Sequence, residues 1–168
     1  MQIRALDPVA DRADVAALLT KAQDYYLLWK GYPPGAEEVD DVFIGGPPGC
    51  DPAQSHRLGL YLDDPLAGLQ LSGVAELSFG FPEPQDAYLG LMILAPSARS
   101  GGHGAAFLAH VEGLARARAA RTLYLAVLEK NTRGHAFWTR MGFGPTGVSR
   151  DSTENGLSHR IHRLKKPL

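Results

Sequence analysis

A short glycine-rich turn, residues 96–104, is the segment of this sequence best suited to chemistry. It reads Pro-Ser-Ala-Arg-Ser-Gly-Gly-His-Gly and joins an apolar stretch to the start of a long helical pattern. Glycines let the backbone approach an anion closely, the N–H groups at a helix start are unpaired, and Arg99 adds a positive charge. The turn therefore suits a pyrophosphate group. The alternative interpretation is an ordinary flexible turn, because glycine pairs are common.

Two other phosphate-binding patterns do not fit this turn. A P-loop requires Gly-Lys followed by Ser or Thr, and that run is absent from the sequence. The dinucleotide pattern requires Gly or Ala at the position where Phe107 stands. The turn therefore favours a different kind of nucleotide.

Histidine and cysteine, which often bind metals or act as nucleophiles, are poorly placed here. His159 and His162 would point to opposite faces of an expected strand, and their spacing does not match a zinc site. Cys50 is the only cysteine and lies in a loop rich in Pro and Gly, where a nucleophilic role is not expected. A single cysteine also cannot form an internal disulfide, which favours a reducing compartment. We therefore expect no metal site and a cytoplasmic protein.

The turn must be positioned by the elements on either side of it. Residues 87–94 and 123–128 are apolar on both alternating faces, as central strands covered by helices on both sides would be. Between them, residues 102–120 carry an apolar stripe with helical spacing. The other expected elements are, in order, a strand at 3–6, helices at 11–29 and 36–44, an antiparallel pair at 57–62 and 69–79, a helix at 132–141, and two short strands near Gly147 and His162.

Length and composition indicate one domain over residues 1–168. A chain of this length with 45% hydrophobic residues can bury a core without disulfides. The longest uncharged stretch runs only from residue 87 to 98, shorter than the roughly 18 residues that a membrane span requires. The first residues have no apolar segment typical of a signal peptide. We therefore expect a globular protein without a membrane partner.

The turn resembles the signature of the GNAT superfamily of acyl-CoA N-acyltransferases, Arg/Gln-x-x-Gly-x-Gly/Ala. Arg99, Gly102 and Gly104 meet that signature, and Pro96 precedes it as in the family. Further residues follow the family's order, with Trp138 where a tyrosine is usual: Asn131, then Ala136-Phe137-Trp138, then Met141-Gly142-Phe143. Residues 24–34, together with Phe81-Pro82, resemble a bacterial subgroup of uncertain substrate.

The resemblance implies a fold and a set of residues that bind a cosubstrate. The fold would be of the α/β (α+β) class, a mostly antiparallel twisted sheet of six to seven strands with about four helices on both faces and splayed central parallel strands. The cosubstrate would be acetyl-CoA, with its pantetheine arm on the backbone of 92–94, its pyrophosphate on 99–105 and its thioester beside 131, 137 and 138. The residues concerned are Met92, Ile93, Leu94, Arg99, Ser100, Gly101, Gly102, His103, Gly104, Ala105, Asn131, Phe137 and Trp138.

The implied reaction is direct transfer of an acetyl group to a primary amine of a small molecule or peptide. Glu76 would be the base that removes the amine proton, because the family commonly has a base on the strand beside the acyl-CoA strand. Indole N–H has no useful acidity, so Trp138 cannot protonate the leaving thiolate, and Tyr25 becomes a candidate along with Tyr26, Tyr88 and Tyr124. The alternatives are a solvated strand face for Glu76, core or rim positions for the tyrosines, and a catalytically silent acyl-CoA sensor for the protein.

The distribution of charge bears on the partners. Residues 1–98 hold 5 basic and 14 acidic side chains, whereas residues 99–168 hold 12 basic and 4 acidic ones. The basic half contains the expected cradle for CoA and the acidic half most of the acceptor wall, which favours a positively charged acceptor. Asp24 would hold a substrate cation or lie on a solvated helix face. We expect no nucleic-acid partner, since no binding motif accompanies the basic residues, and family habit suggests a homodimer.

Overall fold

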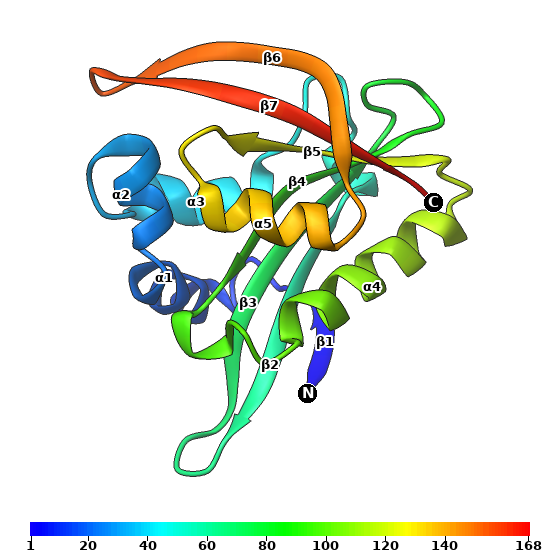
Figure 1. Cartoon of the computed structure of the whole chain (residues 1–168). Coiled ribbons are helices and arrows are strands. Elements are labelled where there is room, and N and C mark those ends of the chain that lie inside the picture. Colours follow the sequence, from blue (N-terminus) through cyan, green and yellow to red (C-terminus); the bar gives the residue numbers. More distant parts are fainter.

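Seven strands form one sheet in the order β1-β2-β3-β4-β5-β7-β6 in the computed structural model, which describes all residues from Met1 to Leu168. Every neighbouring pair is antiparallel except β4 and β5 (Figure 1). The strands are β1 (Gln2–Ala5), β2 (His56–Asp64), β3 (Gly68–Phe79), β4 (Ala87–Leu94), β5 (Thr122–Leu128), β6 (Gly144–Glu154) and β7 (Leu157–Pro167). The expected mixed, mostly antiparallel sheet is confirmed.

Five α-helices cover the two faces of the sheet. They are α1 (Arg12–Lys21), α2 (Asp24–Lys30), α3 (Ala36–Ile44), α4 (His103–Ala117) and α5 (Thr132–Arg140), with short 3₁₀ turns at Pro52–Gln54 and Pro96–Ala98. The stretch expected as one helix over 11–29 is two helices, because the chain turns after Ala22 and restarts at Asp24. Ala22 and Tyr26 are both buried, so apolar residues keep their helical spacing on either side of the break. For this reason the sequence pattern does not reveal the break.

The last two strands are longer than the sequence pattern indicates. β6 and β7 form an antiparallel ribbon, but most residues of β6 are exposed on both sides. A strand that is not buried on one face carries no regular alternation of apolar and polar residues. The ribbon is therefore poorly marked in the sequence, although it forms one edge of the sheet.

Two apolar clusters lie on opposite faces of the sheet. On one face α4 inserts Phe107, Leu108 and Val111 against residues of β3, β4 and β5. On the other face α1, α2 and α3 pack against β2, β3 and β4 through residues that include Val15, Tyr26, Val39 and Val74. The sheet is thus covered on both sides, which explains why its central strands are apolar on both faces.

The parallel pair in the middle of the sheet separates soon after it begins. β4 and β5 are paired only where Ala87, Tyr88 and Leu89 face Leu123, Tyr124 and Leu125. The register between β3 and β4 shifts at the next position, so that Glu76 faces Leu91 and Gly90 is left over as a β-bulge. From Gly90 onward β4 has no strand partner on the side of β5. The splayed central parallel strands expected from the sequence are therefore confirmed.

Helix α2 is held beside this opening from three directions. The ammonium group of Lys30 donates to Glu38 Oε1 of α3 at 2.7 Å, and both side chains are buried. A ring nitrogen of His159 on β7 lies 2.6 Å from the carbonyl oxygen of Trp29, and Asn155 donates to the carbonyl oxygen of Lys30 at 3.4 Å. These contacts fix the side chains that α2 presents to the opening. No helix of the structure is long and apolar enough to cross a membrane.

Candidate active site

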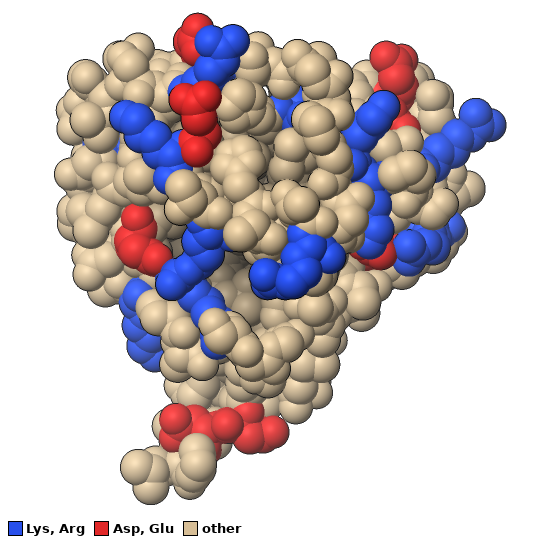
Figure 2. Space-filling view, in the orientation of Figure 1, with Lys and Arg blue, Asp and Glu red and all other residues tan.

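A cleft of about 530 Å³ occupies the space where β4 and β5 separate. Its walls come from α2, the second half of β4, the turn before α4, the end of β5 and the beginning of α5. Lys and Arg side chains gather on the face of the molecule that carries α5 (Figure 2). The lining residues are Asp24, Tyr25, Leu28, Leu89 to Leu94, Arg99, Ser100, Gly104, Leu125 to Leu128, Lys130 to Gly134, Phe137 and Trp138.

The turn at one end of the cleft presents a row of free backbone donors. No backbone N–H from Ser100 to Ala105 donates to an acceptor within the protein. Ser100 and Gly102 have positive φ angles, 69° and 81°, which turn successive N–H groups toward one side. Gly104 leaves room for Phe137, since a Cβ atom there would lie 3.2 Å from that ring. The turn therefore has the donors and the concave backbone that an anion such as a pyrophosphate requires.

The side chain of Arg99 is directed away from these donors. Its Nη1 and Nη2 atoms donate to the two carboxylate oxygens of Asp24 at 2.5 and 2.9 Å, and its Nε donates to the carbonyl oxygen of Leu94 at 3.0 Å. Arg133 of α5 lies 3.7 Å from the same carboxylate. The hydrogen bond from Arg99 lowers the pKa of Asp24 below its usual value. Asp24 thus joins α2 to both the turn and α5 across the mouth of the cleft.

Helix α5 places three of the expected residues in the cleft wall. Asn131 caps the helix, its side-chain oxygen accepting from the N–H of Gly134 at 2.9 Å. Phe137 and Trp138 pack edge to face with ring centroids 4.8 Å apart, and Trp138 also contacts Phe143 of the core side. The capping role of Asn131 accounts for its place directly before the helix.

Glu76 lies beside the cleft rather than on its surface. Only 3% of the residue is exposed, so the alternative interpretation, that Glu76 lies on a solvated strand face, is wrong. Its Oε1 atom accepts from Arg57 at 3.0 Å and from the hydroxyl of Ser78. Its Oε2 atom has no hydrogen-bond partner. Burial raises the pKa of Glu76, although Ser78, Arg57 and the backbone N–H of Gly90 oppose that effect; the Gly90 N–H lies near the carboxylate but does not reach hydrogen-bond geometry with Oε2.

Gly90 is the residue that separates Glu76 from the cleft. Gly90 lines the cleft, and a Cβ atom built on it would lie 2.1 Å from Glu76 Oε2. The free carboxylate oxygen therefore occupies the volume that a side chain at position 90 would need. Because position 90 has no side chain, only its backbone lies between the carboxylate and the cleft.

Of the four candidate tyrosines, Tyr25 alone lines the cleft. Burial raises the pKa of Tyr25 to about 12, so its phenol keeps its proton at neutral pH. Tyr26 is buried in the core between helices and sheet. Tyr88 and Tyr124 lie side by side on β4 and β5, on the face of the sheet that α2 covers.

The structure brings most, but not all, of the residues expected from the sequence to one place. Those that line the cleft are Tyr25, Met92, Ile93, Leu94, Arg99, Ser100, Gly104, Asn131, Phe137 and Trp138. Those that do not line it are Glu76, Gly101, Gly102, His103 and Ala105. The sequence did not predict several further lining residues, namely Leu28, Lys130, Arg133 and those of β5. They belong to no motif, and only their positions within or beside expected elements could have indicated them.

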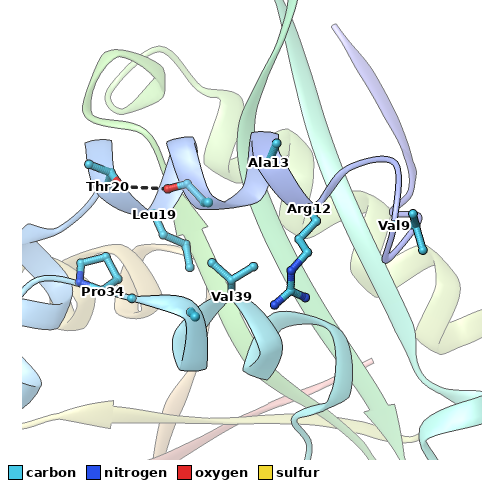
Figure 3. A pocket seen from close by; sticks show the side chains of 10 residues that line it. Val9, Arg12, Ala13, Leu19, Thr20, Pro34 and Val39 are labelled. Atoms are coloured by element: carbon cyan, nitrogen blue, oxygen red, sulfur yellow. Dashed lines mark hydrogen bonds between the residues drawn. The ribbon is translucent and has the colours of Figure 1, made fainter.

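A second hollow lies between α1 and α3 and has about 570 Å³. Its lining is mostly aliphatic, and Leu19 and Val39 point toward each other from the two helices (Figure 3). Arg12, the only charged residue in it, pairs with Asp40 at 2.5 Å. No group of three or more His, Cys, Asp or Glu side chains is placed to hold a metal ion anywhere in the chain. The cleft between β4 and β5 is therefore the place where chemical groups converge.

Known proteins share this architecture. Residues 18–143 match the sequence profile of the acetyltransferase (GNAT) family, and no curated protein matches the chain. An acetyltransferase from Thermus thermophilus is 22% identical, with a TM-score of 0.72, and the match covers 99% of this chain and 96% of that one. The ribosomal-protein-alanine N-acetyltransferase from Brucella melitensis is 20% identical, with a TM-score of 0.75 over 100% of both chains. An acetyltransferase from Bacillus subtilis, solved in complex with CoA, is 18% identical, with a TM-score of 0.65 over 99% and 98%. At these identities the solved structures support the fold alone.

Proposed function

The chain belongs to the GNAT acetyltransferase family, and on that premise we propose that it transfers the acetyl group of acetyl-CoA to a primary amine. The observation that carries the proposal is the cleft between β4 and β5, with a row of free backbone donors at one end and an unpaired strand edge along one wall. These two features match the two polar parts of CoA, its pyrophosphate and the amides of its pantetheine arm. The same feature supports a domain that spans residues 1–168, since its walls come from both halves of the chain.

The residues present fit such a cosubstrate. The N–H groups from Ser100 to Ala105 would donate to the pyrophosphate, and the free edge of 92–94 would pair with the pantetheine amides. Asn131, Phe137 and Trp138 line the same cleft, and the thioester end would lie beside them. Backbone N–H groups of β4 near the bulge would stabilise the negative charge that develops on the thioester oxygen during attack.

Glu76 is our candidate for the proton acceptor. An ammonium group must lose a proton before it can attack, and a neutral amine must lose one after attack. Glu76 Oε2, which has no hydrogen-bond partner and lies behind Gly90, could accept that proton. The carboxylate would act through one water molecule, because it is buried and does not line the cleft. The amine nitrogen would form a bond to the thioester carbon, giving a tetrahedral intermediate. As the intermediate collapses to the amide, the C–S bond would break and the thiolate of CoA would leave.

Tyr25 is our candidate for the residue that protonates the thiolate. Its phenol lies in the cleft and is neutral at pH 7, since burial raises its pKa to about 12. Trp138, at the position where the family usually has a tyrosine, has no acidic proton to give. That replacement favours a second candidate function, a protein that binds acyl-CoA without turnover.

Two measurements test the proposed function. Acetyl-CoA should raise the melting temperature of the protein, and free CoA thiol should appear when a panel of amino acids, polyamines, aminoglycosides and peptides is added. Gly104→Asp places bulk and negative charge in the cradle and should abolish the thermal shift. Gly113→Asp is the matched control, because Gly113 is on the same helix with open space around it.

Each outcome distinguishes the alternatives. A shift with acetyl-CoA and no thiol release on any amine would support the silent binder. No shift at all, in a protein with a normal circular dichroism spectrum, would remove the proposal that the cleft takes acetyl-CoA. A shift retained by Gly104→Asp would show that the cosubstrate does not use the turn.

A further inference from the structure

The face of the sheet that α2 covers carries a positively charged side chain, Arg163, whose role the proposed function does not explain. β7 pairs with β5 so that Tyr124 faces Lys165 and Ala126 faces Arg163. Side chains two residues apart on a strand share a face, so Arg163 and Tyr124 lie on the same face. Tyr88 pairs with Tyr124 and shares that face too. Arg163 therefore lies on the side of the sheet where Tyr88 and Glu76 lie.

Arg163 is unusual among the arginines of the chain. Its side chain is half-buried, yet no carboxylate lies within 4.0 Å of it and its guanidinium donates to no acceptor. Arg57 and Arg99 are also half-buried, but both have carboxylate partners. Its one defined contact is with an aromatic ring, the Phe81 ring, at 5.1 Å from its Cζ atom. A guanidinium with unused donors in a partly desolvated place is suited to a planar or tetrahedral anion.

A series of neighbouring side chains leads from Arg163 across the sheet to Glu76, which lies behind the cleft wall at Gly90. Phe81 contacts Tyr88 edge to face at 5.2 Å between ring centroids. Tyr88 pairs with Ser78 across the β3 and β4 register, and the hydroxyl of Ser78 donates to Glu76. In the sheet, β4 lies between β3 and β7, so Glu76 of β3 and Arg163 of β7 lie on opposite sides of Tyr88. An acceptor that places its amine near Glu76 would extend over Tyr88 toward Arg163.

No other charged group on this side of the sheet forms a salt bridge with Arg163, although Asp86 and Glu83 lie near Tyr124 as Arg163 does. Arg150 of β6 faces Ile161 of β7, so it shares the face of Arg163, and it has no carboxylate partner either. Glu76 is already paired with Arg57. Asp86 and Glu83 belong to the segment after β3 and neither lies within 4.0 Å of Arg163. The positive charges of Arg150 and Arg163 also oppose the rise that burial causes in the pKa of Tyr88.

We propose that the amine acceptor also carries an anionic group, a carboxylate or a phosphonate, and that Arg163 binds this group. The proposal rests on the proposed function and narrows its substrate class. The sequence favours a positively charged acceptor, because the first half of the chain is acidic. The structure differs because β7 places Arg163, a basic residue of the second half, beside elements of the first half. Arg163 would be a specificity-determining residue, and Arg150 would strengthen the local positive potential.

Matched acceptors test this inference. The L-amino acids, the decarboxylated amines with the same side chains and the corresponding 1-aminophosphonic acids are compared as acceptors by CoA release. We expect kcat/KM to be at least about tenfold higher for the amino acids, the aminophosphonic acids or both than for the decarboxylated amines, which lack the anionic group and are called neutral-tailed amines below. The ratio between the two acid classes then separates a carboxylate site from a phosphonate site.

Variants of β7 give the decisive comparison. Arg163→Gln should lower kcat/KM for the anionic acceptors by about tenfold or more, mainly through KM, and leave that for the neutral-tailed amines unchanged. Arg163→Lys should restore part of the loss. Arg160→Gln is the control, because it removes the same charge from the same strand but Arg160 lies on the opposite face, near Asp151 and Ser149. Equal losses for both kinds of acceptor, or no preference in the unaltered protein, would overturn the inference.

The inference can fail while the proposed function stands, and the reverse also holds. Efficient acetylation of neutral-tailed or cationic amines alone would keep acetyl transfer and remove the anionic acceptor. If no amine is acetylated, calorimetric titration of the N-acetylated acids into the protein replaces the rate measurement. Binding that Arg163→Gln abolishes supports the anion site, and absence of such binding overturns it.

Discussion

At the scale of single residues, two carboxylates beside the cleft, Glu76 and Asp24, are each held by side chains from other elements. Glu76 keeps one oxygen paired with Arg57 and Ser78 and the other free behind Gly90. Asp24 neutralises Arg99 at the mouth of the cleft. Each carboxylate forms its salt bridge with an arginine that is distant in the chain. The charge and the pKa of each carboxylate therefore depend on contacts that a single segment of sequence does not show.

The first prediction concerns the proposed base, Glu76. Glu76→Gln should lower kcat by about a hundredfold or more, because proton removal by a positioned group contributes at least that much. The carboxylate must be ionised to accept a proton, and its pKa is raised, so the rate should fall at acidic pH starting above the ordinary value of 4.5. This acid limb of the pH profile should disappear in Glu76→Gln. Glu83→Gln, in the exposed turn that follows β3, should leave the profile unchanged, and an acid limb that persists in Glu76→Gln would assign the base elsewhere.

The second prediction concerns the Asp24 clasp. Asp24→Asn removes a negative charge from the cleft mouth and releases Arg99 and Arg133, so CoA should bind more tightly, by about fivefold at low salt. The gain should shrink as salt is raised, because Asp24 and Arg133 are largely exposed. Calorimetric titration measures both effects, with the exposed Asp14→Asn as the control. Weaker binding in Asp24→Asn would mean instead that the clasp holds the turn in its binding shape.

At the scale of elements, helix α2 depends on its neighbours for its place. It has only 7 residues, too few to be stable alone in water. The buried pair of Lys30 and Glu38 ties it to α3, and Glu38 Oε2 also accepts from the N–H of Gly35 at 2.7 Å. Burial alone would raise the pKa of Glu38, but Lys30 and Gly35 outweigh it and hold the pKa below its usual value. The position of Tyr25 in the cleft is thus set by a salt bridge behind it.

The third prediction follows from that salt bridge. Glu38→Gln leaves the ammonium of Lys30 buried without an opposite charge and should lower the free energy of unfolding by about 3 kcal/mol. Urea unfolding followed by circular dichroism measures the change. Glu37→Gln, one residue earlier and exposed, should change it by less than about 0.5 kcal/mol. Similar values for the two variants would show that the pair is not what holds α2.

At the scale of the whole molecule, the sheet brings the acidic and basic halves of the chain into contact. Arg99 pairs with Asp24 across the cleft. Asp11 is buried near the N-terminus, where it accepts two bonds from Arg4 and others from Asp7 and Tyr61. Arg4 holds the pKa of Asp11 well below its usual range. The fold therefore relies on several carboxylates that are ionised.

The fourth prediction is the pH dependence of stability. Asp11, Asp24 and Glu38 have lower pKa values in the fold than in the unfolded chain, so their contribution is complete above the ordinary values, 3.8 and 4.5, and is lost as the pH falls through the lowered ones. Glu76 has the opposite sign, because its raised pKa weakens the fold as the pH rises above 4.5. We expect the urea midpoint to fall steeply below about pH 4. Asp11→Asn should cost about 2 kcal/mol at pH 7 and flatten that fall, and an unchanged slope would place the acid sensitivity elsewhere.

Much of the fold was readable in the sequence, because it depends on local patterns. The apolar runs of β4 and β5 and the stripe of α4 each lie within about twenty residues, so their periods identify them. The break at Ala22 and the length of the β6 and β7 ribbon were not readable. In the first case burial continues through the break, and in the second β6 has no buried residue and the buried residues of β7 include the polar His159.

The sequence by itself determined the glycine turn, the mixed sheet and the family, because a glycine turn between a strand and a helix is specified by consecutive residues. Only the tertiary structure decided that Asp24 holds Arg99, that Gly90 leaves room for Glu76 and that Arg163 stands unpaired beside Phe81. Each of these contacts joins residues from separate elements, such as Asp24 and Arg99, which are 75 positions apart. Strand register, a bulge and helix packing set such contacts, and no local pattern of residues encodes them.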